Sequence, residues 1–290
     1  VTGLDVVRRQ VGEEVRRLPA RLDAATGVAR SLVHPREALR KTLRYGRSVP
    51  RVAGLAGPPG SPLLAQRSLS WRFSAFDVAF TDLRAAAKAA RASINDAYLA
   101  GLVGGFRIYH EKLGSPLTSM PVAIPISVRT AADTAGGNRI AVGRLAAPVA
   151  MEDPFERVLT IREQVRQARH EPAVDLFNTL GPTLAWLPAG VLAQFGGTTA
   201  MNDLQASNVP GIPFDVFVAG AKVERMYPFG PLPGCAVMAT MITHGPTACL
   251  GINADAAAVT EPDLFAESLV AGFTEVLSLA PGAGPITQVG

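Results

Sequence analysis

The chain has 290 residues, of which 48% are hydrophobic and 18% are charged. This length and composition predict a well-buried globular protein with one large or two ordinary domains. No apolar run reaches the ~18 to 20 residues that cross a bilayer, and charges interrupt residues 1–30 too often for a signal peptide. Two cysteines, Cys235 and Cys249, are too few for a disulfide framework and lack partner ligands at metal spacing. We therefore expect reduced core cysteines in a cytoplasmic protein, with no transmembrane helix and no metal site.

The net charge of +4 is unevenly distributed along the chain. Residues 1–60 hold twelve Lys and Arg against five Asp and Glu, a net charge of +7, so the remainder carries −3. The basic stretch is either a solvated helical face or a contact for anionic headgroups and phosphate groups. No recognition motif or set of interleaved aromatics points to nucleic acid, so we expect no nucleic-acid partner.

The first part of the chain reads as a helical connector. Residues 1–53 have apolar positions near helical spacing, interrupted by three prolines, and residues 54–62 are rich in Gly and Pro. We therefore predict a basic connector over 1–62 and a separate domain over 63–290. The chain starts with Val1, which indicates either a piece of a longer protein or a non-standard start codon written as valine.

The domain begins with a strand and two helices. Bulky residues at alternating positions predict a strand over 68–78, and Thr81 is placed to cap a helix over 82–91. Ser93 then opens the most regular helix of the sequence, with Asp96 three residues later, where its charge favours a helix N-terminus. The simplest role of Asn95 and Asp96 is helix capping.

Two further strands and a helix follow. Residues 121–129 predict a buried strand and residues 138–150 the next one. Residues 153–170 predict a helix, with Asp153 as its cap and Pro154 at its first position. Residues 174–195 are apolar and broken by prolines, so they form short helices that line either a core or a tunnel for an apolar chain.

Ser207-Asn208-Val209-Pro210-Gly211-Ile212-Pro213 is the most distinctive stretch of the sequence. Two prolines fix φ on either side of a glycine, so its local chemistry predicts a turn between two strands. After it we expect a strand over 214–223 and a loop over 227–234. Strands over 236–244 and 248–254 are predicted to pair across a Gly245-Pro246 turn, and Thr260 to cap a final helix.

Several of these segments, in this order, resemble the C-terminal half of the bacterial wax ester synthase/diacylglycerol acyltransferase family. The resemblance covers roughly residues 63–279, and Ile212 stands where the family has a proline. The segments that carry it are Asn95-Asp96-Ala97-Tyr98-Leu99-Ala100, Pro121 to Arg129, Gly137-Asn138, and Ser207 to Gly211.

The resemblance implies an α/β fold of the CoA-dependent, chloramphenicol acetyltransferase-like superfamily: a mixed sheet flanked by helices. It also implies transfer of a fatty acyl group from acyl-CoA to diacylglycerol or a long-chain alcohol, giving triacylglycerol or a wax ester. Acyl-CoA would be a co-substrate, with no separate cofactor. A cytoplasmic location at the inner membrane or at lipid droplets would follow from the lipid substrates.

The general base of the family is the second histidine of a His-His-x-x-x-Asp-Gly motif, because the pKa of histidine lies near neutrality. None of the four histidines of this chain, His34, His110, His170 and His244, stands in such a motif. We therefore expect the chain to start after the catalytic half and to be inactive alone. Its partner would be the N-terminal half that carries the paired histidines, in the same polypeptide or in a separate chain.

The resemblance also suggests roles for individual residues. It gives Asn95, Asp96, Asn138, Ser207, Asn208, Pro210 and Gly211 a part in the site's architecture or in substrate and CoA binding. Arg129 is either an ion-pair partner or a CoA contact. Thr243 stands where the family has a serine, and its hydroxyl is a candidate oxyanion donor.

Two other readings remain open. In the first, the chain is a non-catalytic subunit that binds lipid or a partner and lacks the base. In the second, it is another acyltransferase of the superfamily, of the peptide-synthetase condensation type. The missing phosphate loop and the missing Gly-x-Ser-x-Gly motif argue against nucleotide chemistry and against an α/β-hydrolase.

Overall fold

The computed structural model describes the chain from residue 58 onwards with gaps, and these residues form a mixed α/β domain. The described residues are 58–127, 140–171, 202–212, 214–232 and 234–289. The strands are β1 (Trp71–Ala79), β2 (Met120–Ser127), β3 (Ile140–Ala147), β4 (Leu204–Ile212), β5 (Phe217–Val218), β6 (Ala221–Lys222), β7 (Val237–His244), β8 (Thr247–Asp255) and β9 (Thr287–Gln288). The helices are η1 (Pro62–Leu64), α3 (Phe80–Ala89), α4 (Ile94–Lys112), α5 (Pro154–Arg169) and α8 (Pro262–Leu277).

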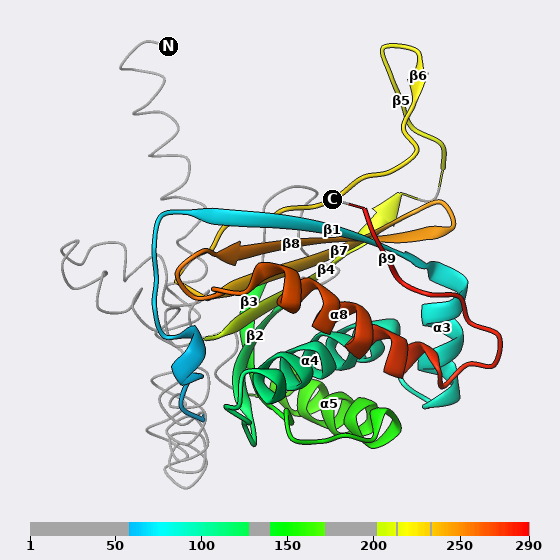
Figure 1. The fold of residues 1–290 in the computed structure, drawn as a ribbon. Helices are drawn as coiled ribbons and strands as arrows, with labels where there is room; N and C mark the ends of the chain where they lie inside the picture. Colours follow the sequence, from blue (N-terminus) through cyan, green and yellow to red (C-terminus); the bar gives the residue numbers. More distant parts are fainter. Residues whose placement is uncertain (1–57, 128–139, 172–201, 213, 233, 290) are drawn as a thin grey trace, which may run out of the picture. The chain divides into compact units, whose positions relative to one another are not determined.

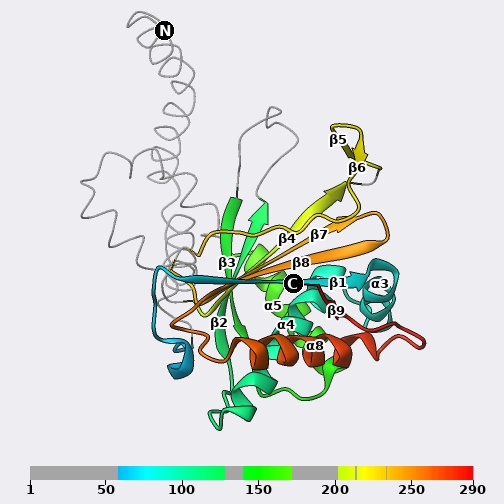
Figure 2. The ribbon, with the colours of Figure 1, turned by 45° about the horizontal axis from the view of Figure 1, so that its top comes forward.

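Seven strands form one sheet in the order β3-β2-β4-β7-β8-β1-β9. β4 pairs in parallel with both β2 and β7, and the other pairs within this sheet are antiparallel. The sheet is therefore mixed, as the sequence predicts. Helices α4, α5 and α8 lie on one face of it in both views (Figures 1 and 2).

The core lies between this face and the helices, since alternate residues of each strand point toward it. Leu204 and Ala206 of β4 and Val237 and Met241 of β7 belong to the buried cluster that includes Phe106 of α4. Helices α4 and α8 approach each other closely through glycines. A Cβ added at Gly272 would lie 2.1 Å from the backbone nitrogen of Gly105.

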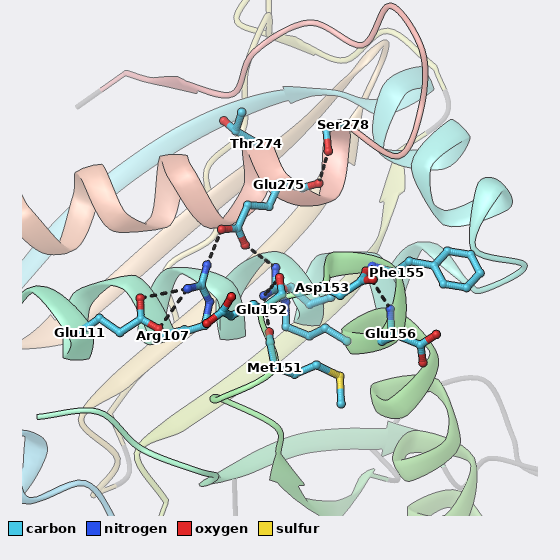
Figure 3. Close-up of polar contacts among 12 residues, drawn as sticks. Arg107, Glu111, Met151, Glu152, Asp153, Phe155, Glu156, Thr274, Glu275 and Ser278 are labelled. Carbon is cyan, nitrogen blue, oxygen red and sulfur yellow. Dashed lines mark hydrogen bonds and ion pairs between the residues drawn. The ribbon is translucent and has the colours of Figure 1, made fainter.

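The three helices are also joined by charged side chains. Arg157 of α5 is fully buried, and its Nη2 donates to Oε2 of Glu275 of α8 at 2.6 Å. Arg107 of α4 donates to the other oxygen of the same carboxylate and to Glu111 (Figure 3). The Arg157 guanidinium also donates to the carbonyls of Ala100, Met151 and Glu152. Burial lowers the pKa of Arg157, and the Glu275 carboxylate partly offsets this shift.

Most predicted elements are confirmed within a few residues. These are the strands β1, β2, β3, β7 and β8 with the Gly245-Pro246 turn, the helices α3, α4, α5 and α8, and the caps at Ser93 and Asp153. Cys235 and Cys249 are free and buried, as expected. The predicted helices over 1–53 and 174–195 lie outside the described residues.

Four local predictions are wrong. Ser207 to Ile212 is part of strand β4 and not a turn. The strand expected over 214–223 is instead the short hairpin β5–β6, because Ala219 and Gly220 adopt φ of 49° and 84° and reverse the chain. Thr81 and Thr260 cap nothing, since α3 begins at Phe80 and α8 at Pro262, each without a side-chain cap.

The linker joins the domain more closely than its composition suggests. Ser61 is buried, and its backbone N–H donates to Oδ2 of Asp203 at 2.7 Å. Its hydroxyl lies 2.7 Å from Nε2 of His110, whose Nδ1 lies 2.7 Å from the carbonyl of Phe106. The predicted boundary at residue 62 stays a prediction.

Candidate functional site

The distinctive Ser207-to-Gly211 stretch lies in β4, an inner strand of the sheet, toward the C-terminal end of that strand. The parallel register places Ser207 beside Thr240 and Asn208 beside Met241 of β7, and it shifts between Val209 and Ile212. Gly211 packs directly against β7, because an added Cβ would stand 1.9 Å from the carbonyl oxygen of Thr243. The structure therefore brings Ser207, Asn208, Pro210, Gly211 and Thr243 together along two neighbouring strands.

A loop crosses the sheet face opposite the helices (Figure 1). We call residues 224–232 the strap and the sheet face beneath it the strap face. The strap packs tightly, because a Cβ at Gly251 would lie 2.0 Å from the carbonyl oxygen of Pro228. One at Gly230 would meet the side chains of Met238 and Thr240 at 2.7 Å and 3.4 Å.

Polar contacts anchor the strap at both ends. Asp77 of β1 accepts from Nε of Arg225 and from the hydroxyl of Tyr227, each at 2.7 Å. Burial, together with Asp77, raises the pKa of Tyr227 to about 12. Further along, Nδ2 of Asn253 donates to the carbonyl of Gly230 at 2.9 Å. The strap is thus tied to β1 and β8.

Three side chains on the strap face keep unpaired polar atoms. Thr240 Oγ1, Asn253 Oδ1 and His244 Nδ1 are buried and have no hydrogen-bond partner. Nε2 of His244 lies 2.7 Å from the carbonyl of Val223 and donates to it. Sequence reasoning missed Thr240 and Asn253, because neither stands in a motif.

Thr243 does not lie on the strap face with these three side chains. Thr243 alternates with Ile242 and His244, so it shares the parity of Met241, which faces the helices. Thr243 is half-buried near the end of β7. Its assignment as an oxyanion donor stays a prediction.

Asn95 and Asp96 lie in the first turn of α4. Ser93 Oγ accepts from the backbone N–H of Asp96 at 3.2 Å, and Oδ2 of Asp96 accepts from the backbone N–H of Ser93 at 2.8 Å. This reciprocal pair is a capping box. The capping role predicted for Asp96 is therefore present, and no polar contact of the strap reaches it. Arg129 and Asn138 lie outside the described residues.

Two absences hold within the described part of the chain. None of its helices is long and apolar enough to cross a membrane. None of its histidines, cysteines and acidic residues gather in threes as a metal site would require.

Aromatic side chains are exposed beside the strap. Trp71, Phe73 and Phe229 are 47%, 53% and 45% exposed, and the rings of Phe73 and Phe229 meet edge to face at 5.1 Å. Phe73 lies opposite Asn253 in the β1–β8 register. An apolar patch therefore borders the unpaired polar atoms.

Comparison with known proteins finds a family match. The family model of the WS/DGAT C-terminal domain matches residues 136–276. Over these residues the chain has the C-terminal domain of the wax ester synthase/diacylglycerol acyltransferase family. The domain's match runs from the gap before β3 into α8, and so includes β4, the strap, β7 and β8.

Two relatives from Mycobacterium tuberculosis H37Rv, both provisionally named diacylglycerol O-acyltransferases, illustrate the relation. Rv2484c is 45% identical over 268 residues, which are 91% of this chain and 54% of the relative. Rv0221 is 28% identical over 231 residues, or 75% and 48% of the two chains. The chain thus spans about half the length of the curated relatives it matches.

Solved structures show the same fold. A wax ester synthase/diacylglycerol acyltransferase from Marinobacter aquaeolei VT8 superposes with a TM-score of 0.58 at 19% identity, covering 82% of this chain and 57% of that one. A condensation domain of the enacyloxin polyketide synthase gives 0.52 at 17% identity, covering 83% and 48%. The predicted acetyltransferase-like fold is therefore confirmed.

Proposed function

We propose that this chain is the C-terminal portion of an acyl-CoA-dependent O-acyltransferase. The reaction joins a fatty acyl group to diacylglycerol, or to a long-chain alcohol, and releases free CoA. The observation that carries the proposal is the 45% identity to a protein provisionally named diacylglycerol O-acyltransferase, across 91% of this chain.

The reaction needs a base, and the sequence lacks the His-His-x-x-x-Asp-Gly motif that supplies it in the family. The base takes the proton of the alcohol, the alcohol oxygen attacks the thioester carbonyl carbon, and the CoA thiolate leaves and takes up the proton. His110 is buried between Ser61 and the carbonyl of Phe106, and His170 bonds to the carbonyl of Arg166 in an exposed position. His244 Nε2 bonds to the carbonyl of Val223. Structural roles suit these three histidines, which favours a base from a separate catalytic half.

The proposal includes three further expectations. The partner is an N-terminal half that carries His-His-x-x-x-Asp-Gly, acyl-CoA is a co-substrate, and no separate cofactor takes part. The lipid acceptor and the basic residues 1–60 favour work at an anionic membrane or a lipid-droplet surface on the cytoplasmic side.

Co-expression of the chain with a catalytic half tests the proposal. The assay follows release of CoA thiol from palmitoyl-CoA with diacylglycerol or hexadecanol as acceptor, and mass spectrometry of the native protein shows which chains accompany it. We expect turnover only when both halves are present. No turnover with either acceptor would remove the catalytic assignment.

A non-catalytic partner-binding role is the second candidate. The exposed aromatic patch of Trp71, Phe73 and Phe229 favours it, because such a patch marks a binding surface whether or not catalysis follows. The same co-expression separates the two candidates, since a stable but inactive complex supports only the binding role.

A further inference from the structure

The β5–β6 hairpin has an exposed tip without charge. Residues 216–221 are all uncharged, and Asp215 and Lys222 flank them. Nζ of Lys222 lies 2.9 Å from Oδ2 of Asp215, so the two charges pair at the base of the tip. Phe217 and Val218 are 60% and 64% exposed. The tip therefore presents apolar side chains to its surroundings, and the charges stay behind them.

A row of basic side chains follows helix α3. Arg84 and Lys88 are four residues apart and so lie on one face of the helix, and Arg91 comes just after its end. All three are exposed, and none forms an ion pair within the described part of the chain. Asp82, the acidic residue of α3, lies in its first turn and accepts from the backbone N–H of Gly284 at 2.8 Å. The basic row is therefore free to attract anions.

The hairpin and α3 join the sheet at the same end. The carbonyl of Val223, next to β6, lies 2.7 Å from Nε2 of His244, the last residue of β7. The turn after His244 reaches the start of α3, where the backbone N–H of Phe80 donates to the carbonyl of Pro246 at 2.9 Å. The apolar tip and the basic row thus belong to one end of the domain, and the hairpin extends beyond the sheet there (Figures 1 and 2).

We propose that this end of the domain binds an anionic lipid surface. The β5–β6 tip enters the bilayer interface, and the basic row of α3 contacts the headgroups. Apolar side chains that enter the interface leave water, while cations beside them are attracted to anionic headgroups. The paired charges of Asp215 and Lys222 limit the depth of insertion, because charges are costly in the hydrocarbon region. The inference rests on the proposed function, whose acceptor is a lipid, and names the surface that reaches it.

Shape and charge favour a lipid surface over a protein partner at this end. A stable protein interface buries roughly 800 Å² on each partner. The tip is narrow, because β5 and β6 have two residues each, and its large exposed side chains are Phe217 and Val218. A lipid interface accepts such a tip without a matching pocket, and its negative charge complements the basic row of α3.

Flotation of the full chain with lipid vesicles tests the proposal. The vesicles are pure phosphatidylcholine, or phosphatidylcholine with about 30% phosphatidylglycerol as the anionic lipid. The double variant Arg84→Gln, Lys88→Gln should bind the anionic vesicles about tenfold more weakly than the wild type and the neutral vesicles equally well. The double variant Phe217→Ser, Val218→Ser should lose about tenfold in binding to both kinds of vesicle, since apolar contact does not depend on lipid charge.

Matched variants separate this surface from general charge and from folding. Arg162→Gln, Arg169→Gln removes two positive charges from exposed positions of α5 and should bind both vesicles as the wild type does. Phe217→Trp keeps a large apolar side chain and should keep the binding, with its added indole emission shifted to the blue on anionic vesicles. All substituted side chains are exposed, so the melting temperatures should stay close to that of the wild type.

Each outcome decides the proposal. Equal binding by the wild type and both double variants overturns it, and the basic residues 1–60 then account for any vesicle binding. An equal loss in the α5 control overturns the role of α3. If the tip variant keeps vesicle binding and instead loses association with the catalytic half, the tip is a protein contact and the lipid surface is contradicted. Vesicle binding needs no turnover, so a complex that transfers no acyl group removes the proposed function and leaves this result standing.

Discussion

Asp203 places a titrating carboxyl at the point where the linker meets β4. Burial raises the pKa of Asp203 to about 6 from its ordinary value of 3.8, although the backbone N–H of Ser61 and the charge of Arg67 act against the shift. Between these two pH values the folded state holds a proton that the unfolded state has released. The contribution of Asp203 to the free energy of unfolding therefore falls as pH rises through this window and is constant above it.

We predict that Asp203→Asn removes this dependence. The free energy of unfolding of the wild type, relative to the variant, should fall by at most about 3 kcal/mol between pH 4 and pH 6.5. Burial lowers the pKa of His110 and gives an opposite trend at acid pH, but both proteins keep His110, so the difference isolates Asp203. Urea unfolding at four pH values measures it, and a constant difference would contradict the assignment.

The capping box at Ser93 gives a second prediction for a single residue. Ser93→Ala removes the acceptor of the Asp96 N–H and leaves the Asp96 carboxylate without the Ser93 hydroxyl. We expect a loss of about 1 kcal/mol in the free energy of unfolding, with KM for acyl-CoA unchanged in the complex of both halves. Ser93→Thr, which can still cap, serves as the control. A changed KM would point to a substrate role for this helix start.

Single residues also show where the sequence is sufficient and where it is not. The capping box is local, so Ser93 and Asp96 could be identified from their spacing alone. Thr240 and Asn253 could not, because their neighbourhood depends on the register of β7 with β8 and on a strap between them. Family motifs drew attention to Thr243, whereas strand alternation puts Thr240 on the strap face.

At the scale of elements, the wrong prediction for β4 has a clear physical reason. Proline and glycine normally end a strand, but β2 pairs with β4 only at Leu204 and Gln205. Beyond this point no residue that the structure describes pairs with β4 on that side, and the register of β4 with β7 shifts between Val209 and Ile212. Pro210 therefore has no ladder hydrogen bond to lose, and Gly211 allows the close contact with Thr243.

The prediction at the scale of elements concerns the ion pairs that join helices α4, α5 and α8. Glu275 forms ion pairs with Arg157 and Arg107, which come from two other helices (Figure 3). Glu275→Ala leaves the buried Arg157 guanidinium without its counter-charge, so we expect a loss of about 3 kcal/mol in the free energy of unfolding. Glu163→Ala, which breaks the exposed pair with Arg166, should change stability little. Equal effects of the two substitutions in chemical denaturation would contradict this role for Glu275.

At the scale of the molecule, the two faces of the sheet differ. Helices α4, α5 and α8 cover one face, whereas described residues cover the other only where the strap crosses it (Figures 1 and 2). Trp71, Phe73 and Phe229 remain exposed there. On the proposed function, the catalytic half is the partner that this patch would bind.

We therefore predict that the double variant Trp71→Ser, Phe73→Ser weakens association with the catalytic half at least tenfold. Both side chains are about half exposed already, so the melting temperature of the isolated chain should fall by only a few degrees. Phe155→Ser is the matched control, because Phe155 is 38% exposed on α5 and lies on the helix side of the sheet. Analytical ultracentrifugation of the co-expressed halves measures the dissociation constant. Truncating an aromatic anchor at an interface removes much of the binding free energy. If the double variant and the control associate equally well, the patch is therefore not the interface.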